Sequence, residues 1–451
     1  MKPVIRPLST LLMGGIYLLS FFVTIPYASF LISLFALAVL VSYFPYLART
    51  PKILISVLFT AGVLMDPSVD GVTAFFFALQ TNANLLAIFI FVPLLAIPIQ
   101  QGQYLKYIEV IFAYSIKKTH QLYLFTTIAS GSVGAVMNIG TLPILNDLTD
   151  THAFKPFDEI RLKALSRGFV MAFMWSPYFI SMALVLSYFD VSWLQLFPIG
   201  LAVTGIMMAI GFLQERKNSS PIPESPLVQS TVTLGPAKRK VFELALILLA
   251  ITAAILLIER LTGLSVLAIV PLTAIGVSAV WSLLIGTPRE FFESLQGYAR
   301  GKVVYMGNEL SIFIIAGAFG AALLNNGAAD WIRSLLETLN ITHVLLLIPV
   351  MALLMTIPSI IGVHPIITAA ILAITLSSSP LFADDHLYLG LGLLASWMLA
   401  ILTSPFSGLN LMLAAISRKS SVYIAFKMNL TFALLTWGVC YAVIAALYAI
   451  L

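Results

Sequence analysis

The spacing of charged side chains constrains the fold of this chain more than any other feature. No Asp, Glu, Lys or Arg occurs between Arg6 and Arg49, and none occurs between Glu337 and Asp384. Only 10% of the 451 residues are charged, whereas about 25% are charged in a typical soluble domain. Apolar runs of about 20 residues are typical of helices that cross a bilayer. The sequence therefore predicts an all-α polytopic membrane protein.

Charge-poor runs predict about 11 transmembrane helices. They lie near 8–25, 28–47, 53–80, 84–100, 168–189, 191–213, 241–258, 263–285, 306–326, 387–417 and 428–451. Two further apolar runs do not fit single crossings, because 121–145 is rich in Gly, Ser and Thr, and 343–380 is too long and contains several prolines. We expect each of these two runs to enter the membrane as a re-entrant helical hairpin. Two additional crossings are the alternative.

Basic clusters orient the predicted helices, because Lys and Arg are enriched in cytoplasmic loops. The clusters are Lys2/Arg6, Arg49/Lys52, Lys106/Lys117/Lys118, Lys155/Arg161/Lys163/Arg167, Arg216/Lys217, Lys238/Arg239/Lys240 and Arg418/Lys419. All of these clusters lie on one side of the membrane if both irregular runs are hairpins. If both runs cross the membrane, one basic cluster lies on the external side. We therefore expect a multi-pass protein of the plasma (inner) membrane, with a cytoplasmic N-terminus and an external C-terminus.

A weak internal repeat divides the chain. The motif "QQG" at 100–102 is matched by "NNG" at 325–327, and "WSPYF" at 175–179 is matched by "TSPFS" at 403–407. The expected parts are an extra N-terminal helix (1–27), repeat 1 (28–213), a cytoplasmic linker (214–240) and repeat 2 (241–451). Each repeat then holds five crossings, an odd number, so the two would run in opposite directions, as in many transporters. A chance match of short motifs is the alternative.

Ser-Pro-aromatic triplets interrupt two of the predicted helices. Pro177 and Pro405 each remove a backbone donor and free the carbonyl one turn earlier. Inside a membrane, such a break is tolerated only beside protein or a water-filled cavity. Two broken helices at matching positions would expose helix ends toward a central binding site. An ordinary proline kink is the alternative for either break alone.

Hydroxyl and amide side chains near the breaks and hairpins are the candidate ligands of a solute or an ion. Helix N-termini at hairpin ends would add a preference for an anion. The predicted binding residues are Ser130, Ser132, Asn138, Thr141, Ser176, Ser359, Thr403, Ser404, Ser407 and Asn410. His364 and Glu309 are candidates for carrying a coupling proton, because ionisable groups are costly within a membrane. A neutral hydrogen-bonded tip residue and an interface anchor are the respective alternatives.

This layout resembles the ion transporter superfamily, which includes divalent anion/sodium symporters and arsenite efflux pumps. "WSPY" (175–178) and "TSPF" (403–406) stand where the symporters carry a Thr-Pro-Pro-like triplet. The hairpins hold "SGSVGAVMN" and "SIIGVHP" in place of the Ser-Asn-Thr of that family. The resemblance implies a secondary active transporter that works by alternating access, with H⁺ as coupling ion or with Na⁺ bound at the hairpin tips.

A membrane-embedded enzyme and a channel are the alternative functions. The predicted helices contain no His-Glu-x-x-His motif and no close pair of acids, and the single cysteine, Cys440, rules out a cysteine-rich metal site. We expect no cofactor and no metal beyond the coupling ion. The expected partners are the lipid bilayer and a small, anionic solute, not nucleic acid, and a homodimer is left open.

Overall fold

The chain is almost entirely helical in the computed structural model, which describes residues 2–150, 154–217, 219–222 and 233–450. These residues form no β-strand, and nine of their helical segments are long and apolar enough to cross a membrane. A helix pairs its backbone donors and acceptors internally, as a bilayer requires. The predicted all-α polytopic membrane fold is confirmed. Within the predicted linker, residues 218 and 223–232 lie outside the described residues.

Seven helices precede the first hairpin. They are α1 (Lys2–Leu19), α2 (Ala28–Tyr43), α3 (Arg49–Met65), α4 (Val69–Ala78), α5 (Ala83–Phe91), α6 (Ala96–Gln101) and α7 (Tyr104–Ser115). The predicted span 53–80 is wrong as a single helix, because α3 ends before Asp66. Pro67 has no backbone donor, and the Ser68 hydroxyl caps α4 by accepting a hydrogen bond from the Gly71 amide (3.0 Å). The apolar residues on both sides of Asp66–Asp70 outweighed this turn in the prediction of a single span.

Residues 119–149 form a helical hairpin, called hairpin 1. Its first helix, α8 (Thr119–Met137), ends at Asn138, whose φ of 55° redirects the chain. Its second helix, α9 (Thr141–Thr149), returns toward the start of α10 (Asp158–Met171), where the Arg161 guanidinium donates to the Asn146 side chain (2.9 Å). The turn 138–140 is called tip 1.

Residues 344–377 form a second hairpin, hairpin 2, from α18 (Val344–Ile360) and α19 (Pro365–Ser377). Its turn, 361–364, is called tip 2. Between the two hairpins lie α11 (Ile180–Tyr188), α12 (Trp193–Lys217), α13 (Leu234–Thr262), α14 (Val266–Ile285), α15 (Pro288–Tyr298), the π-helical turn η6 (Ala299–Val303), α16 (Gly307–Asn325) and α17 (Ala328–Thr338). After hairpin 2 come α20 (His386–Thr403), α21 (Gly408–Ile416), the π-helical η8 (Tyr423–Asn429) and α22 (Leu430–Ile450).

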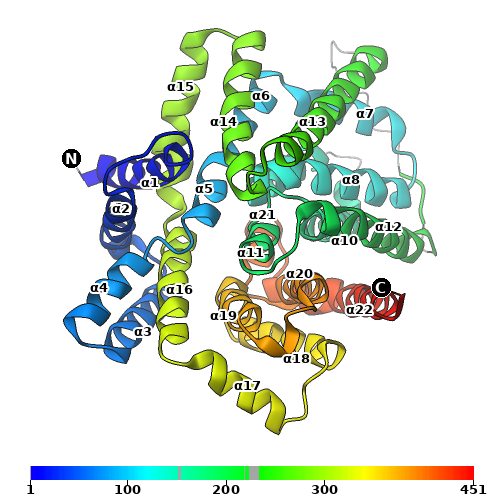
Figure 1. Cartoon of the computed structure of the whole chain (residues 1–451). Coiled ribbons are helices and arrows are strands. Elements are labelled where there is room, and N and C mark those ends of the chain that lie inside the picture. The colour runs from blue at the N-terminus through cyan, green and yellow to red at the C-terminus, as the bar shows by residue number, and fades with distance from the viewer. Residues whose placement is uncertain (1, 151–153, 218, 223–232, 451) are drawn as a thin grey trace.

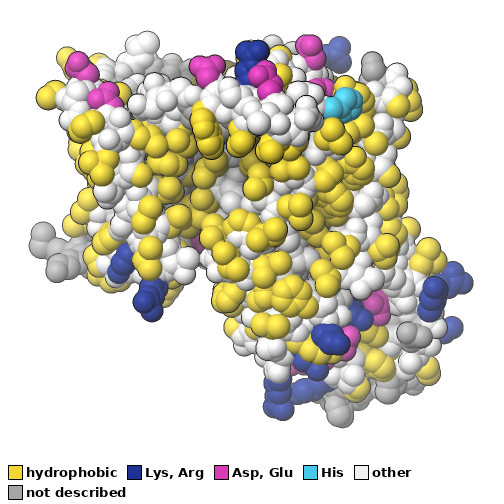
Figure 2. All heavy atoms as spheres, turned by 90° about the horizontal axis from the view of Figure 1, so that it is seen from below, with side chains coloured by type: hydrophobic (Ala, Val, Ile, Leu, Met, Phe, Trp, Pro, Cys, Tyr) yellow, Lys and Arg dark blue, Asp and Glu magenta, His cyan; other side chains and the backbone are white. Residues whose placement is uncertain are grey.

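The helices form two groups separated by α16. Helices α1 to α4 lie on one side of α16, and the hairpins lie with α10, α12, α20 and α22 on the other (Figure 1). In Figure 2, acidic side chains and a histidine gather along one edge of the molecule, and Lys and Arg gather mainly along the opposite edge. Hydrophobic side chains cover the surface between the two edges. This distribution matches a protein whose waist is surrounded by lipid.

Candidate functional site

Two helices are interrupted at the Ser-Pro-aromatic triplets. Break 1 (175–179) separates α10 and its last 3₁₀ turn from α11, and break 2 (404–407) separates α20 from α21. In both breaks, the serine before the proline keeps its helical hydrogen bond: the Ser176 amide donates to Ala172 (2.9 Å) and the Ser404 amide to Ala400 (3.0 Å). Helical bonding then stops, because proline lacks the next donor.

The serine hydroxyls tie both breaks in the same way. The Ser176 hydroxyl donates to the Ala135 carbonyl of hairpin 1 (3.4 Å), and the Ser404 hydroxyl donates to the Ser359 carbonyl of hairpin 2 (2.5 Å). Each hydroxyl also accepts from the amide two residues later, that of Tyr178 (3.3 Å) or Phe406 (3.2 Å). Two segments 228 residues apart therefore share one pattern of hydrogen bonds, and each break is fastened to a hairpin.

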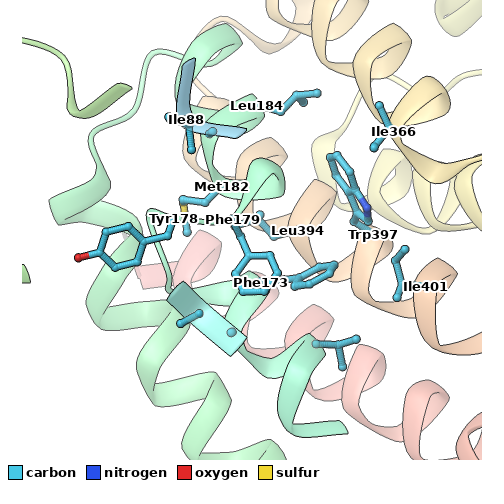
Figure 3. Packing of buried hydrophobic residues seen from close by; sticks show 14 of the residues in the cluster. Ile88, Phe173, Tyr178, Phe179, Met182, Leu184, Ile366, Leu394, Trp397 and Ile401 are labelled. Atoms are coloured by element: carbon cyan, nitrogen blue, oxygen red, sulfur yellow. The ribbon is translucent and has the colours of Figure 1, made fainter. Parts of the chain in front are cut away.

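The freed carbonyls of break 1 are satisfied from α12. The Trp193 indole donates to the Trp175 carbonyl (3.0 Å), and the Thr204 hydroxyl donates to the Met171 carbonyl (3.2 Å). Around them, the ring of Phe173 packs against that of Phe179, and Figure 3 shows Tyr178 pointing away from this pair. Break 1 is thus held in a largely aromatic environment.

The freed carbonyls of break 2 are satisfied by one side chain, Asn410. Its amide nitrogen donates to the carbonyls of Ile401 (3.2 Å), Leu402 (3.0 Å) and Ser404 (2.9 Å). Its side-chain oxygen is buried and has no hydrogen-bond partner within the described part of the chain. The hydroxyl of Ser407 accepts a hydrogen bond from the backbone amide of Asn410 (3.2 Å) and so caps α21. A fully buried amide with one free acceptor is a candidate ligand for a cation or a solute donor.

Tip 1 borders a small cavity. The cavity measures about 10 Å³ and is lined by Asn138, by Tyr178 of break 1 and by apolar side chains of α5 and the turn after it. This volume is close to what one water needs. The next polar residue, Thr141, begins α9 and is fully buried, and its hydroxyl has no partner among the described residues. Unpaired polar groups of this kind mark a place where a ligand or water is expected.

Tip 1 also meets break 2. The side chain of Ile139 lies 3.2 Å from where a Cβ on Gly408 would be, and Gly408 is the first residue of α21. The structure therefore places tip 1 against the start of α21, the helix that Ser407 caps and that contains Asn410.

Tip 2 contains a glycine and a histidine. Gly362 has a φ of 102°, which L side chains rarely adopt, and the Phe406 ring of break 2 lies against it. The Nδ1 atom of His364 accepts from the Ile366 amide (3.2 Å), so this side chain caps α19. Ser359 is buried, and its hydroxyl lacks a partner in the described chain.

Three predicted site residues have local roles. The Ser130 hydroxyl donates to the Leu165 carbonyl (2.8 Å), which joins α8 to α10 about two turns before tip 1. Ser132 is exposed on α8. The Thr403 hydroxyl donates to the Leu399 carbonyl in its own helix (2.7 Å). The candidate coupling residue Glu309 lies in the first turn of α16 and is half-buried.

Several polar residues were missed by sequence reasoning. Arg161 and Arg167 were assigned to a loop, but α10 already begins at Asp158 and buries both. Arg167 donates to the Met428 carbonyl (2.9 Å) and thereby joins α10 to η8. Lys302 was not among the predicted site residues, yet its ammonium approaches tip 1, 3.9 Å from where a Cβ on Gly140 would be.

Solved structures share this fold. The chain matches the YdaH transporter of Alcanivorax borkumensis with a TM-score of 0.59 and 14% identity, over 85% of this chain and 90% of that one. It matches MtrF of Neisseria gonorrhoeae with a TM-score of 0.55 and 12% identity, over 83% of this chain and 84% of that one. YdaH is described as having an unusual topology, and MtrF as illuminating a class of antimetabolite efflux pumps. Neither a protein-family model nor a curated sequence matches the chain.

Proposed function

We propose that this protein is a secondary active transporter that moves a small, anionic solute across the plasma (inner) membrane by alternating access, coupled to H⁺ or Na⁺. One observation carries the proposal. Two breaks with the same hydrogen-bond pattern are each fastened by a serine to a helical hairpin. Symmetric broken helices beside hairpins are the usual way in which secondary transporters build a polar site within the bilayer.

The proposed binding site lies where tip 1 meets break 2. Asn138, Thr141, Ser407 and Asn410 supply amide and hydroxyl groups, and α9 and α21 both begin there. Helix N-termini carry partial positive charge, which favours an anionic group. Free side-chain oxygens such as that of Asn410 are suitable ligands for Na⁺. Ser176, Ser359, Thr403 and Ser404 would hold the breaks and hairpins in place around it.

The topology belongs to the same proposal. We propose two inverted repeats, 28–213 and 241–451, with hairpins 1 and 2 re-entering the membrane from opposite sides. The gathering of Lys and Arg along one edge (Figure 2) supports a cytoplasmic location of that edge under the positive-inside rule, and we propose that the N-terminus lies on the same side. The resemblance to the ion transporter superfamily is retained as part of this proposal.

The shared fold favours transport over the two alternatives. Both structural neighbours are described as a transporter or an efflux pump, and this similarity supports transport over a membrane-embedded enzyme. A channel would need a continuous pore, whereas the breaks and tips are packed against one another. The antimetabolite chemistry named for MtrF makes export of an organic anion one direction to be tested.

Flux into proteoliposomes tests the proposal. A thermal-shift screen of the purified protein against organic and inorganic anions, with and without Na⁺, selects a labelled solute. We expect saturable uptake that depends on an imposed H⁺ or Na⁺ gradient and stops when an ionophore collapses it. Flux that grows linearly with solute concentration would indicate a channel, and the absence of gradient-driven flux would contradict the proposal.

A further inference from the structure

Lys302 lacks the partners that the other half-buried basic residues have: among the described residues, Arg6, Lys52 and Lys419 each lie over an aromatic ring, and no ring or carboxylate faces the Lys302 ammonium. Lys302 lies in η6, the π-helical turn between α15 and α16, and its side chain is half-buried. Within the described ranges, no Asp or Glu lies at ion-pair distance from its ammonium, whereas Arg161, Lys163, Arg167 and Lys240 each have a carboxylate partner. A partly buried cation without a counter-ion is costly, so its placement calls for a ligand.

The ammonium of Lys302 is aimed at tip 1. It lies 3.9 Å from where a Cβ on Gly140 would be, and, apart from the adjacent residues and the local helix backbone, it is the one described atom within 4 Å of that point. Gly140 directly precedes Thr141, the first residue of α9, whose buried hydroxyl is unpartnered in the described chain. A cation therefore lies beside the N-terminus of a nine-residue helix, and the first residue of that helix carries a buried hydroxyl without a partner in the described chain. All three favour an anion.

The position of η6 is held firmly. The Tyr43 hydroxyl of α2 donates to the Val303 carbonyl (2.8 Å), and the hydroxyl of Tyr298 donates to the carbonyl of Ile90 in α5. Single-turn π-helices are frequent at functional sites, because the extra residue redirects side chains. Burial lowers the pKa of the Lys302 ammonium, and a bound anion would oppose that shift.

We propose that Lys302 is the anion-recognition residue of the site, and that its ammonium binds a carboxylate or other anionic group of the solute against tip 1. The inference rests on the proposed transport function, since it assigns a specificity residue to the same site. Lys302 would add to the binding site a contact from the connection between α15 and α16, which belongs neither to a hairpin nor to a broken helix. Solute binding would then link tip 1 to the rest of the molecule through one charge pair.

The rate of cysteine modification at tip 1 reports the local electrostatic potential, and this measurement does not require the transported solute to be known. Gly140 has a φ of −61°, so a Gly140→Cys variant introduces no backbone strain. The native Cys440 is buried, and the wild-type protein serves as the control for any reaction of this native thiol. The variant is purified in detergent, so that reagents can reach the protein from both of its membrane sides. One sample is then treated with an anionic methanethiosulfonate and another with a cationic one. The ratio of the two rates reports the local potential, because a change in thiol ionisation affects both rates equally. An exposed Gly297→Cys variant, with no atom within 4 Å of its Cβ, supplies the reference ratio.

We expect the anionic reagent to be favoured at Cys introduced at position 140 by about tenfold or more relative to the reference. Adding Lys302→Gln should abolish this preference, and Lys302→Arg should retain it. Arg300→Gln is the matched control, since Arg300 is an exposed basic residue in the same turn. A ratio that Lys302→Gln leaves unchanged, or a position 140 that neither reagent reaches, would overturn the proposal.

Transport separates the failure of this inference from the failure of the proposed function. For an anion that the wild type carries, Lys302→Gln should raise KM at least tenfold and Arg300→Gln should leave it unchanged. Gradient-driven flux with a wild-type KM in Lys302→Gln would retain the transporter and overturn the role of Lys302. A Lys302-dependent rate ratio without any flux would retain the anion site and reject transport.

Discussion

The two helix breaks share a backbone and differ in their side chains. Ser176 and Ser404 make equivalent hydrogen bonds, but the residues that follow are Tyr178 and Phe179 in break 1, and Phe406 and Ser407 in break 2. Break 1 is packed by aromatic rings, and its freed carbonyls are satisfied from α12. In break 2 the same task falls to Asn410, within its own helix pair. The backbone pattern interrupts both helices in the same way, and the side chains make the interruption at break 2 the more polar of the two.

The largest difference between the breaks is expected at Asn410. Replacing Asn410 by Leu leaves three buried carbonyls without their side-chain donor, and should lower the free energy of unfolding by roughly 2 kcal/mol or more and abolish flux. The equivalent position in break 1 holds Met182, and Met182→Leu conserves volume and should cost less than about 1.5 kcal/mol. Thermal unfolding and flux of the two variants test this, and equal losses would remove the distinction.

The serine hydroxyls should show a smaller difference. The Ser404 hydroxyl lies 2.5 Å from its acceptor in hairpin 2, whereas the Ser176 hydroxyl lies 3.4 Å from its acceptor in hairpin 1, so the hydrogen bond of Ser176 is the weaker of the two. We expect Ser404→Ala to reduce the initial rate of uptake about tenfold and Ser176→Ala about twofold. Membrane insertion, checked by yield and gel filtration, should be normal in both. Wild-type flux in both variants would contradict the assignment of these serines to the site.

The cap of α21 gives a third test. Ser407→Ala removes the acceptor for the Asn410 amide and should cost about 1 kcal/mol of stability. Ser407→Asn provides another capping oxygen and should recover most of the loss. If Ser407→Ala unfolds at the wild-type temperature, the cap does not contribute to holding break 2.

The smallest effect on stability is expected at tip 2. His364→Asn keeps a side-chain acceptor for the Ile366 amide but removes the titratable group. If His364 carries a coupling proton, uptake between pH 5 and pH 8 should lose its dependence on pH in His364→Asn and in His364→Gln. An identical pH profile in wild type and both variants would restrict His364 to capping α19.

Much of the fold followed from the distribution of apolar residues. The all-α membrane architecture and the interruption of two helices at Ser-Pro-aromatic triplets were both predictable, because charge scarcity and proline chemistry act locally. The span 53–80 was predicted to run through Asp66, although Asp66 itself was expected to cap the end of a helix, since a hydropathy window averages over the residues that cap and break a helix. The beginning of α10 was missed for the opposite reason, because the buried arginines 161 and 167 look like loop residues without their partners.

The candidate site was only partly predictable. Asn138 and Asn410 were predicted from their positions beside a hairpin turn and a helix break, and their part in binding stays a prediction. Ser130 was included for its composition, yet it serves the contact of α8 with α10. Lys302 could not be found from its local sequence, which resembles an amphipathic surface helix. Its meeting with Gly140 joins residues 162 positions apart and depends on how α15 and α16 pass hairpin 1.

Accessibility of position 138 from both sides of the membrane tests the central claim most directly. An Asn138→Cys variant in sealed, uniformly oriented proteoliposomes would be exposed to an impermeant thiol reagent added outside in one sample and trapped inside in another. Alternating access predicts modification from each side, with a coupling gradient or a transported solute shifting the balance between the two rates. Modification from one side only, or from neither, would contradict a solute site that opens to both sides.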